Sequence, residues 1–246
     1  MKRLMRSAAA LPFQLLPRSV RRRAVQAAFS AAADRDPRAA LRELLQMETD
    51  LHGLIDETAM AYGGGVHVKH RLMRYHDFFV DRIRAGERVL DIGCGYGAVA
   101  HSIAERAAAR VVGIDLESAN VASAKRMFQH PALTFLEGEA PRDLPPGRFD
   151  VVVASNVLEH VDRRREFLTV VQQKAQPARW LIRVPLIDRD WHVPLREELG
   201  LFHFCDPTHF VEYTRDTFAA EMRDAGFNVT DEQINWGELW AEVRRA

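Results

Sequence analysis

An acidic residue that precedes three alternating glycines is the part of this sequence best suited to chemistry. Asp91 lies before Gly93, Gly95 and Gly97 in a run that leads from a predicted strand directly into a predicted helix. Glycine lets the backbone turn sharply and approach a ligand closely, and the free N–H groups at the start of a helix can bind it. A carboxylate at this position would repel a diphosphate and attract an amine. The loop therefore predicts a site for a ligand that carries positive charge.

A second acidic residue, Asp115, ends the next predicted strand about twenty residues further on. An acid at this distance can accept hydrogen bonds from both hydroxyls of a ribose. A nicotinamide-dependent dehydrogenase would also satisfy much of this pattern, because Gly93, Gly95 and Ala98 match G-x-G-x-x-A. Asp91 favours a cationic nucleoside instead.

The elements that must position these residues alternate between strands and helices. The chain then ends in a helix and two strands with no helix between them, which predicts one antiparallel strand at the edge of a mostly parallel sheet. Predicted strands cover 88–92, 110–115, 133–137, 150–155, 180–184, 228–230 and 238–243, and predicted helices cover 98–108, 118–129 and 214–225.

With these motifs in order, the sequence resembles the class I S-adenosylmethionine-dependent methyltransferases. Their first motif, E/D-x-G-x-G-x-G, is matched by Asp91 and the three glycines, and further matches follow at 113–116, 137–140 and 149–161. The resemblance spans residues 69–246. It implies an α/β fold, with a Rossmann-like, doubly wound, mostly parallel seven-stranded sheet, one antiparallel edge strand and an N-terminal helical extension. It also implies S-adenosyl-L-methionine as the cofactor.

The resemblance assigns cofactor-binding roles residue by residue. The Asp115 region would hold the ribose, Glu139 would reach the adenine amino group, and the backbone N–H of Ala140 would reach a ring nitrogen. The predicted cofactor-binding residues are Asp91, Gly93, Cys94, Gly95, Gly97, Asp115, Leu116, Glu139, Ala140, Ser155 and Asn156.

Two histidines are the predicted catalytic residues. Methyl transfer is an in-line displacement that depends chiefly on positioning, but a hydroxyl acceptor must also lose its proton to a base. His160 and His209 are expected at the carboxyl edge of the sheet and suit that role, although His160 could simply pack near the cofactor. Glu159 and His160 resemble a segment of quinone-biosynthesis O-methyltransferases in which Glu-x-x-Glu-His can hold a metal. Asn156 replaces the first glutamate here, so we expect no metal.

The acceptor is expected to contact the long segment at 184–214 and the helix before the glycine loop. Acidic, imidazole and aromatic side chains suit a small molecule or a sugar, either free or linked to a nucleotide or a lipid. The same side chains could instead cap the sheet or bind a metal. The predicted acceptor residues are His70, Tyr75, Asp190, His192, Asp206 and Tyr213. Two other functions remain open: a quinone or lipid methyltransferase at the membrane surface, and a non-catalytic cofactor-binding protein.

Composition divides the chain into a basic arm at 1–34, a helical extension at 35–84, with helices over 36–63 and 69–83, and a methyltransferase domain at 85–246. Residues 1–33 hold seven Lys or Arg and no acidic residue, so the arm could lie on an anionic membrane or be a frayed end. The remaining chain is mildly acidic, which argues against a nucleic-acid partner. Two cysteines and no long apolar stretch favour a cytoplasmic protein, and the basic arm adds peripheral membrane contact as an alternative. The oligomeric state is left open.

Overall fold

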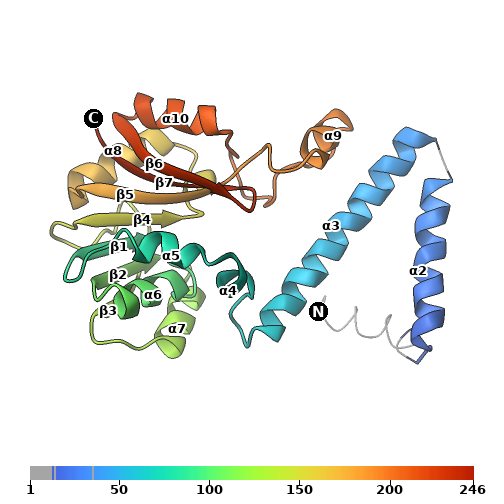
Figure 1. Ribbon diagram of the computed structural model, residues 1–246, viewed down its shortest axis with the longest axis horizontal. Helices are drawn as coiled ribbons and strands as arrows, with labels where there is room; N and C mark the ends of the chain where they lie inside the picture. Colours follow the sequence, from blue (N-terminus) through green and yellow to red (C-terminus); the bar gives the residue numbers. More distant parts are fainter. Residues whose placement is uncertain (1–12, 14, 35) are drawn as a thin grey trace. The chain divides into compact units, whose positions relative to one another are not determined.

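The computed structural model describes residues 13, 15–34 and 36–246 (Figure 1). Contacts divide this part of the chain into two compact units. One comprises the described residues up to Thr58 together with Arg196–Leu201, and the other comprises Ala59–Leu195 and Phe202–Ala246. None of the helices in the described part of the chain is long and apolar enough to span a membrane.

The second unit contains a seven-stranded sheet in the order β3-β2-β1-β4-β5-β7-β6, which confirms the predicted fold class (Figure 1). The first five strands in this order are parallel, and β7 runs antiparallel to both of its neighbours. The strands are β1 (Arg88–Ile92), β2 (Arg110–Asp115), β3 (Leu133–Glu137), β4 (Val151–Ser155), β5 (Arg179–Pro185), β6 (Phe227–Asn235) and β7 (Glu238–Arg245).

The reversed strand β7 lies one position inside the edge, and β6 forms the edge itself. Trp236 and Gly237 both have positive φ, which is the backbone of a tight two-residue hairpin turn. β6 extends beyond the predicted strand. Its second half is mostly polar, so the sequence did not indicate a strand there, but this half also pairs with β7. The helix α10 (Arg215–Asp224) before it begins at Thr214, whose side chain accepts a hydrogen bond from the N–H of Thr217.

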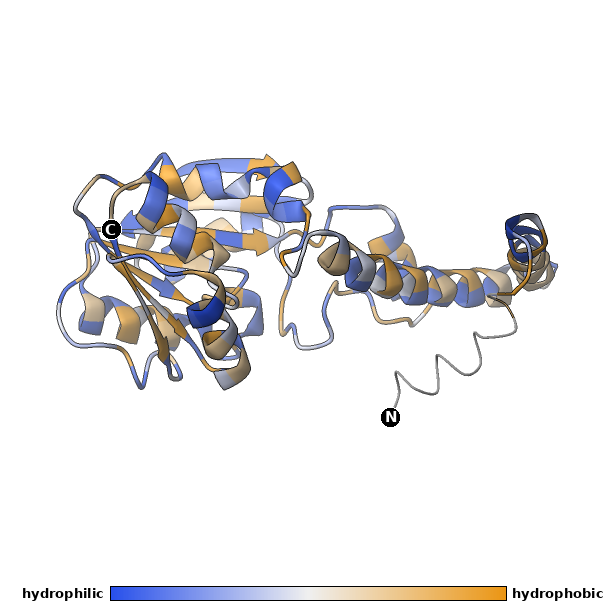
Figure 2. Cartoon of the chain, turned by 90° about the horizontal axis from the view of Figure 1, so that it is seen from below, coloured by the Kyte–Doolittle hydropathy of each residue, from blue (hydrophilic) through white to orange (hydrophobic). Residues whose placement is uncertain are grey.

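Helices cover both faces of the sheet because successive strand residues point to opposite sides. Leu90 and Ile182 belong to the core cluster shared with α8 (Arg164–Ala175) and α10. Val89 and Leu181 belong to the cluster shared with α5 (Tyr75–Val80), α6 (Ala98–Arg106) and α7 (Ser118–Met127). Both faces are therefore buried, and the central strands are largely hydrophobic while the helices carry both kinds of residue (Figure 2). No helix was expected from the sequence at the position of α8.

The predicted single helix over 69–83 is wrong in one respect. Arg74 adopts a left-handed conformation, with φ of 55°, and separates α4 (Lys69–Met73) from α5. Leu72, expected on the buried stripe, is exposed, whereas Tyr75 and Phe79 are buried. Lys69 and His70, at the start of α4, line a cavity of the site described below.

The first unit is built on α2 (Arg18–Ala33) and α3 (Pro37–Tyr62). The predicted basic arm therefore contains a helix, and residues 1–12 and 14 lie outside the described part of the chain. α9 (His192–Glu198) supplies Arg196, which donates to the carbonyl oxygen of Leu45 at 2.7 Å and pairs with Glu48 at 2.9 Å.

Candidate active site

Buried oxygen atoms without hydrogen-bond partners gather at the carboxyl edge of the sheet. Among the residues that the structure describes, the buried side-chain atoms without a partner are Oδ2 of Asp91, Oδ1 of Asn156 and both carboxylate oxygens of Glu159. Asp91 lies on β1, Asn156 directly follows β4, and Glu159 lies in the short helix η1 (Leu158–His160). Leaving such a group unpaired costs about 1–3 kcal/mol. All four atoms are oxygens, so a ligand that satisfies them must bring hydrogen-bond donors or positive charge.

Asp91 shows the strongest electrostatic perturbation in this group. Its side chain is almost completely buried, and burial, followed by repulsion from Asp115, raises the pKa of Asp91 to about 8. A hydrogen bond from the backbone N–H of Ala100, in the first turn of α6, acts in the opposite direction. An ammonium group next to Asp91 would restore the ionised form.

Two cavities meet at the glycine loop. A cavity of 210 Å³ and another of 890 Å³ are both lined by Gly93, Gly95 and Asn156. Asp91 lines the smaller cavity and Asp115 lines the larger one. This arrangement fits an elongated ligand with a cationic end and a nucleoside end.

Asp115 holds the loop in place in addition to lining the larger cavity. Its Oδ2 accepts a hydrogen bond from the N–H of Gly95 at 2.7 Å. Its Oδ1 accepts from the N–H of Glu117 and from Nδ2 of Asn120, both at 3.0 Å. A carboxylate oxygen can accept more than one hydrogen bond, so Oδ2 can still accept from a ribose hydroxyl. Asn120 was not identified from the sequence.

The three loop glycines have different structural roles. All have positive φ, which glycine tolerates without strain. A Cβ at Gly95 would meet open space, whereas a Cβ at Gly97 would come within 2.4 Å of the Phe135 ring. Gly97 lines neither cavity. Its predicted role in cofactor binding is therefore replaced by a role in packing α6 against β3.

The remaining predicted cofactor residues lie around the two cavities. Cys94 lines the smaller one but faces the backbone of Gly113, and burial raises the pKa of its thiol. Ser155 lines it as well and accepts a hydrogen bond from Nη1 of Arg183 at 3.1 Å. The larger cavity is lined by Leu116, Glu139 and Ala140, and the exposed Glu139 pairs with Arg142 at 3.2 Å.

Arg183 is a site residue that the sequence analysis missed. It is buried on β5, pairs with Glu238 at 2.5 Å and lies over the ring of Tyr75 at 3.8 Å. The signal in the sequence was a charged residue within an otherwise apolar strand. Together with Asp91, it gives the smaller cavity one fixed positive and one acidic group, which suits the zwitterionic end of an amino acid.

Tyr75 and His70, predicted to contact the acceptor, do line the smaller cavity. The Tyr75 hydroxyl lies 2.7 Å from Nδ1 of His70, which is 2.8 Å from Nε2 of His76, whose Nδ1 lies 2.7 Å from the Ser102 hydroxyl. Burial lowers the pKa of His70 to about 4 and that of His76 to about 3, so both rings are neutral at pH 7. This chain of contacts fixes α4 and α5 against α6.

The two predicted catalytic histidines lie together. The ring centroids of His160 and His209 are 4.5 Å apart, and His160 lines the larger cavity whereas His209 does not. His209 contacts Glu212 through Nδ1 at 2.9 Å, and His160 contacts the Thr208 hydroxyl through Nδ1 at 2.9 Å. Burial, followed by the charge of His209, lowers the pKa of His160.

Glu159 completes this group, and burial raises its pKa to about 7. One ligand atom from each of Glu159, His160 and His209 lies within 4.8 Å of the others. The sequence indicated too few ligands for a metal because it did not show that His209 approaches the other two. The geometry allows two uses: a base whose protonated form is stabilised by the carboxylate, or a site for a divalent cation.

The structure does not bring the other predicted acceptor residues to the cavities. Tyr213 is buried in the core and donates to Glu221 at 3.0 Å, so its predicted contact with the acceptor is replaced by a structural one. Asp190 and His192 contact each other at 3.8 Å but line neither cavity. Asp206 accepts from the N–H of Thr208 at 2.8 Å, which shapes the turn before His209.

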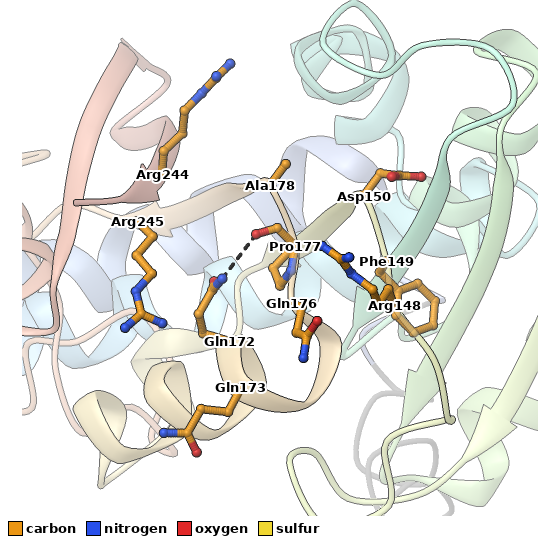
Figure 3. A pocket seen from close by; sticks show the side chains of 10 residues that line it. All are labelled: Arg148, Phe149, Asp150, Gln172, Gln173, Gln176, Pro177, Ala178, Arg244 and Arg245. Carbon is orange, nitrogen blue, oxygen red and sulfur yellow. Dashed lines mark hydrogen bonds between the residues drawn. The ribbon is translucent and has the colours of Figure 1, made fainter.

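A separate hollow lies at the amino ends of β4 and β5, on the side of the sheet away from the candidate site (Figure 3). Its lining includes the residues just before β4 and β5 and the end of β7, with Arg148, Arg244 and Arg245 around it. Gln172, which lines it, donates to the carbonyl oxygen of Pro177 at 3.1 Å (Figure 3). None of the unpartnered oxygens or catalytic candidates lies there, so we do not assign the reaction to it.

Comparison with known proteins agrees with this arrangement. The profile of the methyltransferase domain family matches residues 65–232. The mitochondrial ubiquinone biosynthesis O-methyltransferase of Schizosaccharomyces pombe is 30% identical over 141 residues, covering 53% of this chain and 51% of that protein. The ribosomal protein L11 methyltransferase of Burkholderia mallei is 34% identical over 104 residues, covering 42% of this chain and 33% of that protein. The chain thus spans about half or less of the length of these relatives.

Among solved structures, the magnesium protoporphyrin IX methyltransferase of Synechocystis PCC 6803 has a TM-score of 0.56 at 19% identity, covering 70% of this chain and 83% of that one. This similarity shows the fold. Together with the match to the family profile, it establishes that the chain belongs to the methyltransferase domain family, within the class I S-adenosylmethionine-dependent methyltransferases.

A pair of alanine variants separates the roles of two glycines. Both Gly95→Ala and Gly97→Ala force a left-handed backbone on alanine, at a cost of about 1 kcal/mol. Gly97→Ala also clashes with Phe135, so it should lower the melting temperature by several degrees more than Gly95→Ala. Gly95→Ala should instead weaken binding of S-adenosylhomocysteine by about tenfold or more, since its Cβ enters the ligand space. Thermal unfolding and calorimetry measure the two effects, and the reverse pattern would contradict these roles.

Asp91 should make cofactor binding depend on pH. Its carboxyl group is protonated in the free protein below about pH 8 and must ionise to pair with an ammonium group, so binding releases a proton. Affinity for S-adenosylhomocysteine should therefore rise between pH 5.5 and 7.5, by up to about tenfold per unit. Calorimetry in buffers of different ionisation enthalpy measures the released proton. Asp91→Asn should bind weakly and without this pH dependence. A native protein whose affinity is constant over that range would exclude this role.

Proposed function

We propose that this protein transfers the methyl group of S-adenosylmethionine to a hydroxyl group of a small molecule. The observation that carries the proposal is the set of unpartnered buried oxygens along two cavities that share the glycine loop. The cofactor carries an ammonium group and a sulfonium. These two positive charges can interact favourably with the unpartnered oxygens. A diphosphate-containing cofactor would bring negative charge next to Asp91.

The proposed cofactor would occupy both cavities, with its amino-acid end in the smaller one and its nucleoside in the larger one. In this proposal Asp91 and Arg183 bind the amino and carboxylate groups at one end, and Asp115, Glu139 and Ala140 bind the nucleoside at the other. Asn156 lines both cavities, so its free Oδ1 lies near their junction. The bound cofactor supplies an electrophilic methyl group, and the protein contributes mainly by holding the acceptor in line with it.

His160 is the proposed base for the acceptor hydroxyl. It lines the larger cavity, and its contact with Thr208 through Nδ1 leaves Nε2 to take the proton. His209 is oriented by Glu212 and packs edge-on against the His160 ring. Glu159, buried and without a partner, is placed to stabilise the imidazolium that forms. This modifies the role predicted for His209, which becomes a positioning residue.

The lining of the larger cavity indicates two classes of acceptor. Phe210, which is exposed and lines the larger cavity with His160, offers an apolar surface that suits a sugar or an aromatic ring. A quinol or other lipid-linked acceptor is the second candidate, favoured by the similarity to ubiquinone biosynthesis O-methyltransferases. A screen of nucleotide sugars, phenols, quinols, amines and thiols, with release of S-adenosylhomocysteine as the readout, tests both. If only amine or thiol acceptors react, the proposal of O-methylation fails.

His160→Ala should lower kcat by about 10²-fold or more and leave the affinity for S-adenosylhomocysteine within about twofold. Added imidazole should restore part of the activity. His209→Ala should have a smaller effect on kcat, and Asp190→Ala, outside the cavities, serves as the control.

If imidazole does not rescue His160→Ala and a chelator abolishes the activity of the native protein, the three residues hold a metal and the base assignment is wrong. A loss of cofactor affinity equal to the loss of kcat would also remove His160 from catalysis.

A further inference from the structure

One face of α2 combines exposed apolar side chains with arginines. Val25 and Phe29 are one helical turn apart and are 48% and 41% exposed. Arg18, Arg21 and Arg22 line the same hollow of the surface as these two residues. At 3.6 residues per turn, Arg21 and Arg22 fall on either side of the apolar pair. Arg18 lies in line with the pair, nearer the start of the helix, so the apolar residues have arginines on both sides and at their N-terminal end.

Within the described part of the chain, no ion pair neutralises these arginines. The sequence adds Arg23 and, before α2, no acidic residue at all. Further apolar side chains, Leu15 and Leu16, are exposed just before the helix. α2 buries only Ala32, which lies at the C-terminal end of the same side as Val25 and Phe29, so most of that side stays exposed.

We infer that α2 is a peripheral membrane-binding helix that lies on an anionic bilayer, with Val25 and Phe29 in the interface and the arginines among the lipid headgroups. An apolar stripe flanked by long basic side chains is the pattern of interfacial helices, because the arginine stems extend along the apolar surface while their charges stay in water. The positive charge is complementary to the anionic lipid surface, and each basic residue strengthens the attraction.

The same features disfavour two other occupants. A second copy of α2 on this face would bring its own arginines close to these, with no acidic residue of either helix to compensate. Nucleic acid would use the arginines but would leave Val25 and Phe29 without a role. The inference does not depend on the acceptor proposed above, although a bilayer-bound protein could reach a lipid-linked acceptor directly.

Co-sedimentation of the full chain with vesicles tests this inference. Phosphatidylcholine vesicles serve as the neutral surface, and vesicles with about 30% phosphatidylglycerol serve as the anionic surface. The native protein should bind the anionic vesicles, with binding that weakens in high salt, and should not bind the neutral ones. The variant Arg18→Gln/Arg21→Gln/Arg22→Gln should lose binding by about tenfold or more. The variant Val25→Ser/Phe29→Ser, which keeps the charge, should bind the anionic vesicles several-fold more weakly than the native protein.

A matched control removes three arginines elsewhere. Arg148→Gln/Arg244→Gln/Arg245→Gln changes the exposed basic hollow in Figure 3 by the same charge and should keep vesicle binding within about twofold. If this control loses as much binding as the α2 variant, or if the native protein does not bind anionic vesicles, the inference is wrong.

Two further results would also overturn it. The serine variant could bind vesicles normally while a DNA oligonucleotide displaces the native protein, which would indicate nucleic acid. Alternatively, the α2 variants could change only the sedimentation equilibrium of the protein, which would indicate a second copy. Affinity for S-adenosylhomocysteine should stay unchanged in every variant, which would show that the cofactor site is intact. A failure of the membrane inference can then be distinguished from a failure of the proposed function.

Discussion

The need of buried oxygen atoms for a donor or a positive charge is the constraint on which the site depends. Folding places Asp91, Asn156 and Glu159 at the ends of β1 and β4 and leaves four of their oxygens unpaired. Such atoms lower stability unless a ligand satisfies them. A fold that keeps them is therefore arranged for binding, and their common chemistry restricts the ligand to one rich in donors and cationic groups.

The parallel sheet makes this concentration of groups possible. Parallel strands end at one edge, so the loops after β1, β2 and β4 converge there, and helix α6 begins beside the same ligand space. Asp115 links two of these loops through the N–H of Gly95. The reversed strand β7 adds Glu238, which forms an ion pair with Arg183. This ion pair stabilises the buried, charged guanidinium group near the acidic groups of the site.

The sequence predicted the parts of this account that depend on local patterns. The limits of β1 to β5, the glycine loop, Asp115 and the antiparallel end of the sheet follow from periodicity and from motifs with a known spacing, whereas the length of β6 does not. Arg183 with Glu238, and His209 with Glu159, lie far apart in the sequence, and only tertiary folding shows that they meet. Gly97 and Tyr213 were assigned to ligands because spacing cannot distinguish a glycine or an aromatic ring that packs from one that binds. The break at Arg74 was missed because no proline or glycine marks it.

A crystal structure of the complex with S-adenosylhomocysteine tests the central claim most directly. We expect the ligand's amino group within hydrogen-bond distance of Oδ2 of Asp91, its carboxylate facing Arg183, and its nucleoside in the larger cavity beside Asp115. A ligand bound elsewhere, with Asp91 still unpartnered, would contradict the account.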